Sequence, residues 1–238
     1  MNAVLCSGKK ILPLLVCLGF FTDQISLANA SEGAKLIPVP YVSQIPTGAW
    51  VLPWSQACEE ASAAMVEGFY ARKKSIPVSE SVARMKEIFD WEKDHFPSIE
   101  DTDAVQTKRF IDELPLAFKT TIKRNPTLKE IQRELDKDQP VIALVNMYTL
   151  YQASIKRDSY HVLVITGYDD KKKQFIFQDP ARSYEKTHSY DITMSALHDY
   201  NAKSKEGDGV PTVLFTTPPP PTKESFIKRL IDLLKNLF

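Results

Sequence analysis

Apolar side chains recur at every third or fourth residue through much of the first 140 residues, a period that predicts amphipathic helices. We expect helices over about Cys58–Arg72, Ser79–Asp90 and Asp103–Leu114, and a further helix that begins at Thr127. A capping box, Thr127-Leu-Lys-Glu, marks the start of this last helix. Residues 31–57 contain too many prolines for a helix and are expected to be extended and irregular.

Beyond residue 140 the pattern changes to short apolar runs, which are typical of buried strands. The predicted strands are Val141–Val145, His161–Tyr168, Gln174–Gln178, Ser189–Thr193 and Val210–Phe215. A polar turn separates the second strand from the third, which indicates a β-hairpin, and a helical segment from about Met194 to Tyr200 precedes the last strand. Helices followed by an antiparallel sheet predict the α+β fold class.

The N-terminus has the three parts of a signal peptide. Lys9 and Lys10 precede an apolar run, Ile11–Phe21, and Ala28-Asn-Ala30 is a small-residue cleavage site. The run is shorter than the roughly 20 residues that span a bilayer, although an uncleaved anchor is the alternative. Cleavage after Ala30 implies a secreted or periplasmic protein of the cell envelope.

The C-terminus has a different pattern from the folded domain. Residues 217–223 form a proline-rich linker with four consecutive prolines, a composition typical of a stiff polyproline segment. Residues 224–238 combine a broad apolar face with a charged one and predict an amphipathic helix. This helix could contact a membrane surface, dock on a partner or pack back on the domain. The folded domain is expected to occupy residues 31–216.

Charge and composition exclude several functions. Lysine and arginine together number 30, as do aspartate and glutamate, so no basic field indicates nucleic-acid binding. Only eight glycines are present and they form no phosphate-binding loop. The histidines lack metal-ligand spacing. We therefore expect neither a cofactor nor a metal site.

Signal cleavage changes the meaning of the cysteines. It would remove Cys6 and Cys17 and leave Cys58. Exported proteins usually pair their cysteines in disulfides, so a lone thiol is either buried and inert or retained for its reactivity. Cys58 begins a predicted helix, where the helix dipole stabilises a thiolate and lowers the thiol pKa. This position favours a nucleophile over a small buried residue.

A histidine and an aspartate fall at matching ends of the predicted hairpin. His161 opens its first strand and Asp179 follows its second. Because these two ends of an antiparallel pair lie side by side, we expect the Asp179 carboxylate to accept the Nδ1–H of His161. The alternatives are an ordinary core or edge histidine and a simple Asp-Pro turn. The histidines at 95, 188 and 198 lie in charged or polar stretches.

Two glutamines and two tryptophans complete the candidate residues. Gln44 and Gln56 are the candidates for a side-chain amide that donates to a developing oxyanion, and either could instead lie on the surface. Trp50 and Trp54 could line a substrate cleft or pack under the loop that carries them.

Five strings in this order, VPYVSQ, CEEASAAM, PVIALV, HVLVITGYDD and FIFQDP, resemble the papain-like cysteine peptidases of family thirty-nine. These are bacteriocin-processing, double-glycine-leader peptidases and their stand-alone relatives, and the resemblance covers about residues 37–215. It implies a papain-like fold at 31–216, with N-terminal helices packed on an antiparallel β-sheet. By position it implies a catalytic set, with a nucleophile, a base, its orienting partner and an oxyanion donor: Cys58, His161, Asp179 and Gln44, with Gln56 in reserve.

The chain also departs from the family pattern. Many members carry Gly-Pro after the cysteine, whereas Glu59-Glu60 follow it here, a Cys-Glu version that occurs among stand-alone relatives. The sequence shows no transporter module, so cleavage of double-glycine leaders does not carry over. Together with the predicted signal peptide, the resemblance implies an exported cysteine peptidase that hydrolyses a peptide or protein substrate. An acyl-transferring amidase or transpeptidase on the same triad, or a catalytically inactive peptide-binding module, remains the alternative.

Overall fold

The computed structural model describes residues 33–98, 101–152, 160–182 and 186–219. The predicted signal peptide (1–30), residues 220–223 of the predicted linker and the predicted C-terminal helix (224–238) lie outside the described residues. No helix within the described ranges is both long enough and apolar enough to cross a membrane.

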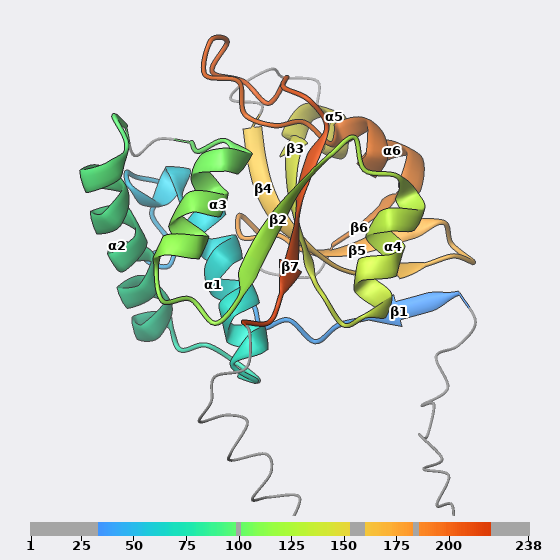
Figure 1. Ribbon diagram of the computed structural model, residues 1–238, viewed down its shortest axis with the longest axis horizontal. Coiled ribbons are helices and arrows are strands. Elements are labelled where there is room, and N and C mark those ends of the chain that lie inside the picture. Colours follow the sequence, from blue (N-terminus) through green and yellow to red (C-terminus); the bar gives the residue numbers. More distant parts are fainter. Residues whose placement is uncertain (1–32, 99–100, 153–159, 183–185, 220–238) are drawn as a thin grey trace, which may run out of the picture. The chain divides into compact units, whose positions relative to one another are not determined.

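The first half of the chain is mainly helical. Its helical part begins with a short 3-10 turn, η1 (Trp54–Gln56). The helices that follow are α1 (Cys58–Tyr70), α2 (Val78–His95), α3 (Ala104–Glu113) and α4 (Leu128–Asp136). The helices α1, α2 and α3 lie together on one side of the sheet, and α4 lies on the other side (Figure 1). The capping box predicted at Thr127 is present, because its hydroxyl accepts the Glu130 amide and Glu130 accepts the Thr127 amide.

An antiparallel sheet forms the centre of the domain, with the strand order β2-β7-β3-β4-β5-β6. Its strands are β1 (Ala34–Leu36), β2 (Lys119–Arg124), β3 (Val141–Asn146), β4 (Tyr160–Asp169), β5 (Gln174–Gln178), β6 (Lys186–Ser189) and β7 (Thr212–Thr217). The strand β1 pairs with the C-terminal end of β4. It lies on the same side of β4 as β3, which pairs with the earlier residues of that strand. Mixed helices and an antiparallel sheet confirm the α+β prediction.

Two elements near the end of the sheet differ from the prediction. Residues 189–193 were expected to form a strand, but β6 ends at Ser189 and helix α6 covers Tyr190–Ala196. The reason is local, because the Ser189 hydroxyl accepts the Ile192 amide at 3.3 Å and caps the helix. The helix expected over 194–200 therefore begins four residues earlier.

The pattern did not predict β1, β2 or the short helix α5 (Met147–Tyr151). The sequence of β2, KTTIKR, is largely polar because this strand lies at one edge of the sheet and pairs only with β7 among the described strands. The conclusion that strands follow helices was therefore too simple, since β1 and β2 belong to the first half of the chain.

The core lies where α1 meets the middle of the sheet. Residues 160–168 of β4 are all buried, which explains their continuous apolar sequence. In α1 the small residues Ala61–Ala64 are buried and allow a close approach to β4. The Ser62 hydroxyl donates to the Val162 carbonyl at 3.4 Å across this contact. The first turn of α1 is thus fixed beside the start of β4.

Gly167 is required by the close approach of β1 to β4. A Cβ at this position would lie 2.2 Å from the Lys35 carbonyl oxygen, which is far inside van der Waals contact. The β4–β5 register also shifts between Ile165 and Gly167. The glycine of the HVLVITGYDD string therefore has a packing reason.

Candidate active site

Cys58 is the first residue of α1, at the point where irregular chain turns into the helix that packs on β4. Its side chain is 4% exposed and forms no disulfide. The helix after it agrees with the predicted position, whereas the residues just before it form the 3-10 turn η1 and are not extended as expected. The structure therefore places this thiol at a helix N-terminus beside the sheet.

His161 and Asp179 meet at the end of the β4–β5 hairpin. The His161 Nε2 lies 2.8 Å from the Asp179 Oδ1, and both side chains are buried. The pairing of Val164 with Gln178 in the hairpin brings the two residues together. The Ala181 amide donates to the same carboxylate oxygen at 2.9 Å, and the Tyr151 hydroxyl donates to the other.

The nitrogen that contacts the aspartate differs from the one expected. We expected Asp179 to bind Nδ1, whereas the structure shows Nε2 in that contact. The described residues offer no hydrogen-bond partner to Nδ1 of His161. This orientation leaves Nδ1 as the ring nitrogen that is available to a thiol or a leaving group.

Asp179 is held as an anion. Burial alone raises its pKa, but the His161 ring, the hydrogen bonds from His161 and Tyr151, and the Ala181 amide outweigh burial and lower the pKa to about 2. The Nε of Arg182 also lies 3.7 Å from this carboxylate. An ionised, buried carboxylate fixes the tautomer of the ring and stabilises an imidazolium at His161.

One cavity joins the residues that the sequence singled out. Its volume is about 360 Å³, and Cys58, His161, Gln44 and Gln56 all line it. Ala181, which follows the Asp179-Pro180 pair, also lines the cavity. Asp179 itself does not line it but contacts the ring of His161. Residues from α1, β4 and the irregular N-terminal chain thus converge on a single space.

The two glutamines differ in how firmly they are held. Gln44 is 2% exposed, and its backbone amide donates to the Pro180 carbonyl at 2.9 Å. Its side-chain Nε2 makes only long contacts with the Trp54 and Ser55 carbonyls, at 3.4 and 3.5 Å, and its Oε1 has no partner among the described residues. Gln56 is half-buried in η1. Gln44 is therefore the better placed candidate.

The environment of the thiol differs from the one that a helix N-terminus alone predicts. The Cys58 Sγ donates to Glu59 Oε2 at 3.0 Å, and no hydrogen bond joins Cys58 to His161 within the described part of the chain. Burial, followed by the charges of Glu59 and Asp101, raises the pKa of the Cys58 thiol well above its ordinary value. These effects outweigh the helix dipole, which we expected to lower it.

The acids after the cysteine are buried rather than exposed to solvent. Glu59 and Glu60 are each 1% exposed, and Glu92 of α2 is fully buried behind them. Burial is the main cause that raises the pKa of all three carboxyl groups, with the charge of Glu92 acting on Glu60. The sequence signal for this is the run of small, mostly apolar residues that follows them in CEEASAAM, because an acid in a helix that is buried on all sides has no solvent-facing side.

A possible set of metal ligands also occurs here. Ligand atoms of Cys58, Glu59 and Asp101 lie within 4.8 Å of one another. The expectation of no metal site rested on histidine spacing, and this set contains no histidine. Thr102, next to Asp101, donates its amide to Glu59 at 2.7 Å and so links this loop to the site.

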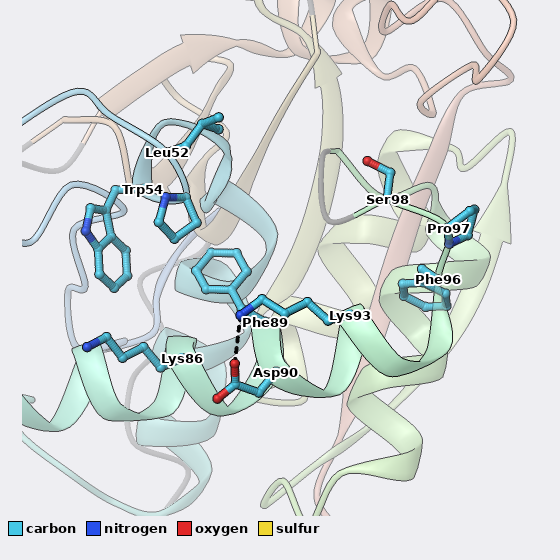
Figure 2. A pocket seen from close by; sticks show the side chains of 10 residues that line it. Leu52, Trp54, Lys86, Phe89, Asp90, Lys93, Phe96, Pro97 and Ser98 are labelled. Atoms are coloured by element: carbon cyan, nitrogen blue, oxygen red, sulfur yellow. Dashed lines mark hydrogen bonds and ion pairs between the residues drawn. The ribbon is translucent and has the colours of Figure 1, made fainter.

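The two tryptophans have separate positions. Trp50 is 59% exposed and lines the cavity of Cys58, as a cleft residue would. Trp54 is buried and packs edge-on against Phe89 with 6.0 Å between ring centroids. It also lines a second cavity of about 740 Å³ on the α2 side, where Figure 2 shows Lys93 paired with Asp90. This second cavity contains neither Cys58 nor His161.

The remaining histidines lie elsewhere. His95 stacks on Trp91, and His198 contacts the Gly209 carbonyl through Nδ1. His188 packs its ring on Tyr151 and Phe177. None of them lines the cavity of Cys58.

Comparison with known proteins identifies the family. No curated protein sequence matches the chain. The model of a family described as Peptidase_C39 like family matches residues 36–207. This range contains every candidate residue described above and more than half of the chain. The chain therefore belongs to the Peptidase_C39 like family, and residues 36–207 form a papain-like, C39-like peptidase domain.

Proposed function

We propose that the protein is a cysteine peptidase that hydrolyses peptide bonds with Cys58 as nucleophile, His161 as base and Asp179 as its orienting partner. The observation that carries the proposal is the convergence of Cys58 and His161 on one cavity, with His161 Nε2 bound to Asp179 at 2.8 Å. The family match supports a peptidase-like domain around these residues.

The residues act in a defined order in this mechanism. His161 Nδ1 takes the proton of the Cys58 thiol, and the resulting thiolate attacks the substrate carbonyl carbon. The C–N bond then breaks as the same nitrogen gives that proton to the leaving amine. Asp179 stays ionised and stabilises the imidazolium through Nε2. Water, deprotonated by His161, then releases the acyl group from sulfur.

Gln44 would stabilise the oxyanion together with the Cys58 amide. The long contacts of its side-chain Nε2 leave the amide free to turn toward a bound substrate. A donor aimed at the oxyanion contributes about 2.7–4 kcal/mol to the transition state. The hydrogen bond from the Gln44 backbone amide to the Pro180 carbonyl keeps Gln44 close to Asp179, the residue before Pro180.

One observation favours a second candidate, a catalytically inactive peptide-binding module. The Cys58 thiol donates a hydrogen bond to Glu59 and, among the described residues, makes none with His161. Burial, followed by the charge of Glu59, raises the pKa of the thiol. In such a module Cys58 would remain protonated and unreactive in the presence of a ligand.

A thiol-directed activity probe separates the two candidates. We expect the probe to label Cys58 of the wild-type chain, and His161→Ala to lower the labelling rate by about tenfold or more, since the imidazolium stabilises the thiolate. His198→Ala serves as the matched control and should leave labelling unchanged. Equal labelling of the wild type and His161→Ala would rule out the proposed pair.

A further inference from the structure

Asp101 brings a carboxylate to the cavity of Cys58. Its side chain is half-buried and lines the cavity, and a carboxylate oxygen lies within 4.8 Å of the Cys58 Sγ. The next residue, Thr102, is held from two sides, because its amide donates to Glu59 at 2.7 Å and its carbonyl accepts the Tyr160 hydroxyl at 2.7 Å. These bonds to α1 and β4 keep Asp101 beside the proposed nucleophile.

This carboxylate sets the charge of the cavity. Among the described residues that line the cavity, Asp101 is the only carboxylic acid, and no lysine or arginine is present. His161, which also lines it, is already paired with the Asp179 carboxylate. A carboxylate in a cleft with low-dielectric walls attracts a cationic ligand. The cavity is therefore suited to a substrate that carries a positive charge near the reacting bond.

Gln44 provides a second acceptor in the same cavity. It is 2% exposed, and its Oε1 has no hydrogen-bond partner among the described residues. Because buried polar atoms nearly always have a partner, this oxygen points to a ligand that donates hydrogen bonds. The Nε2 end of the same amide remains the proposed oxyanion donor. The two acceptors together favour a ligand with several N–H donors, such as an ammonium group.

The distance between Asp101 and the sulfur indicates which ammonium group fits. The α-nitrogen of an amino acid lies about 2.5 Å from the carbonyl carbon of the same residue, and a nucleophile approaches that carbon to about 3–3.5 Å before it reacts. An α-ammonium group is thus within hydrogen-bond reach of a carboxylate oxygen that lies within 4.8 Å of the sulfur. The charged groups of lysine and arginine side chains are several bonds further from the carbon and, when extended, reach beyond this distance. A free N-terminus therefore fits better than a basic side chain.

We propose that Asp101 binds the free α-ammonium group of the substrate, so that the protein acts as an aminopeptidase and removes the N-terminal residue of a peptide. The inference rests on the proposed function, because it names the substrate class of the same nucleophile. The Cys58 sulfur bonds to the carbonyl carbon of the first residue, and the bond from that carbon to the nitrogen of the second residue breaks. The shortened peptide leaves with the proton from His161, and water hydrolyses the thioester to release the amino acid. The ammonium group keeps its protons throughout, and Asp101 only binds it.

Alanyl and lactoyl coumarylamides test the proposal on the full chain. The two compounds differ in one group on the α-carbon, since a hydroxyl replaces the ammonium group in the lactoyl compound. A chelator is present throughout, so that no metal ion occupies the set of Cys58, Glu59 and Asp101. We expect kcat/KM to be at least about tenfold higher for the alanyl compound, because the lactoyl compound lacks the charged hydrogen bond. Equal values for the two compounds would overturn the proposal.

Asp101→Asn is the corresponding variant of the protein. It should lower kcat/KM for the alanyl compound by about tenfold or more and leave the value for the lactoyl compound unchanged, since the lost interaction is with the ammonium group. Asp90→Asn is the matched control, because Asp90 is an exposed acid that lines the second cavity and not the cavity of Cys58. It should leave both values unchanged. An equal loss for both compounds in Asp101→Asn would indicate a structural role and overturn the proposal.

A binding measurement requires neither the Asp101 variant nor catalysis. Tetra-alanine amide, with a free or an acetylated N-terminus, is titrated into Cys58→Ala and followed by calorimetry. The free peptide should bind at least about tenfold more tightly. Equal affinity, or no measurable binding of either peptide, would contradict the inference even if Asp101→Asn failed to fold.

The two measurements separate this inference from the proposed function. If the wild type cleaves free and acetylated peptides equally well through Cys58, only this inference fails. If binding requires a free N-terminus but the wild type cleaves no peptide, only the proposed function fails.

Discussion

At the scale of single residues, the site depends on how a few side chains compete for each proton. Asp179 stays ionised because His161, Tyr151 and the Ala181 amide together oppose the cost of burial. Cys58 has the opposite balance, because burial and the acids near it keep the proton on sulfur. The low dielectric strengthens the hydrogen bonds and charges that stabilise the Asp179 carboxylate. It disfavours the Cys58 thiolate, because the neighbours of that group are acids.

The role of Asp179 leads to a prediction. In Asp179→Asn the side-chain oxygen can still accept a hydrogen bond from Nε2, but the negative charge that stabilises the imidazolium is lost. We expect kcat/KM for peptide hydrolysis to fall by about 10²-fold or more, mainly through kcat. Steady-state kinetics with a fluorogenic peptide measure this loss.

Tyr151→Phe provides the comparison for that experiment. It removes the other side-chain hydrogen bond to the Asp179 carboxylate but leaves the charge in place. It should lose less than about tenfold of the activity. A loss in Tyr151→Phe equal to the loss in Asp179→Asn would show that the charge of Asp179 has no special role.

At the scale of elements, the contact between α1 and α2 buries acids in the core of the helical layer. Glu60 from α1 and Glu92 from α2 influence each other, and Glu59 completes the group at the site end. Their raised pKa values mean that the folded chain holds protons that the unfolded chain releases above the ordinary carboxyl pKa of 4.5.

The stability of the fold should therefore depend on pH. The folded state binds more protons than the unfolded state between about pH 4.5 and pH 8, so the free energy of unfolding should fall as the pH rises through this window. Glu92→Gln should weaken the dependence and raise Tm at pH 8 relative to the wild type. Thermal unfolding across this range measures the effect, and the exposed Glu87→Gln on the same helix should leave the slope unchanged. A wild-type Tm that rises from pH 4.5 to pH 8 would contradict this assignment.

Much of the element pattern was accessible from the sequence, and the failures have physical causes. The capping box at Thr127 and the hairpin around residues 169–173 are local signals, and both are present. The strand predicted at 189–193 failed because one serine side chain caps a helix there. The strand β2 was not recognised because an edge strand with polar residues has little apolar pattern.

The sequence predicted the positions of the candidate residues in the fold better than it predicted their environment. Proximity of His161 and Asp179 follows from hairpin geometry, so it could be expected before the structure was known. The contact of Cys58 with Glu59, and the part of Thr102 and Tyr160 in it, depend on how α1 packs against a distant loop and β4. No short-range pattern carries that information.

At the scale of the whole domain, the candidate site lies where the helical layer meets the sheet. Cys58 comes from α1, His161 and Asp179 come from the β4–β5 hairpin, and Gln44 comes from the irregular chain before α1. Two hydrogen bonds between residues far apart in the sequence connect these parts. The Gln44 backbone amide donates to the Pro180 carbonyl, and the Tyr160 hydroxyl donates to the Thr102 carbonyl. Any change that moves the helical layer relative to the sheet would therefore separate the nucleophile from its base.

Peptide cleavage by the purified chain tests the central claim most directly. A mixture of unmodified peptides is incubated with the wild type, Cys58→Ala and His161→Ala at equal concentrations, and the products are identified by mass spectrometry. We predict that the wild type produces new termini through hydrolysis, with the mass of water gained at each cleavage, and that neither variant does so. Cleavage by Cys58→Ala at the wild-type rate would contradict the account.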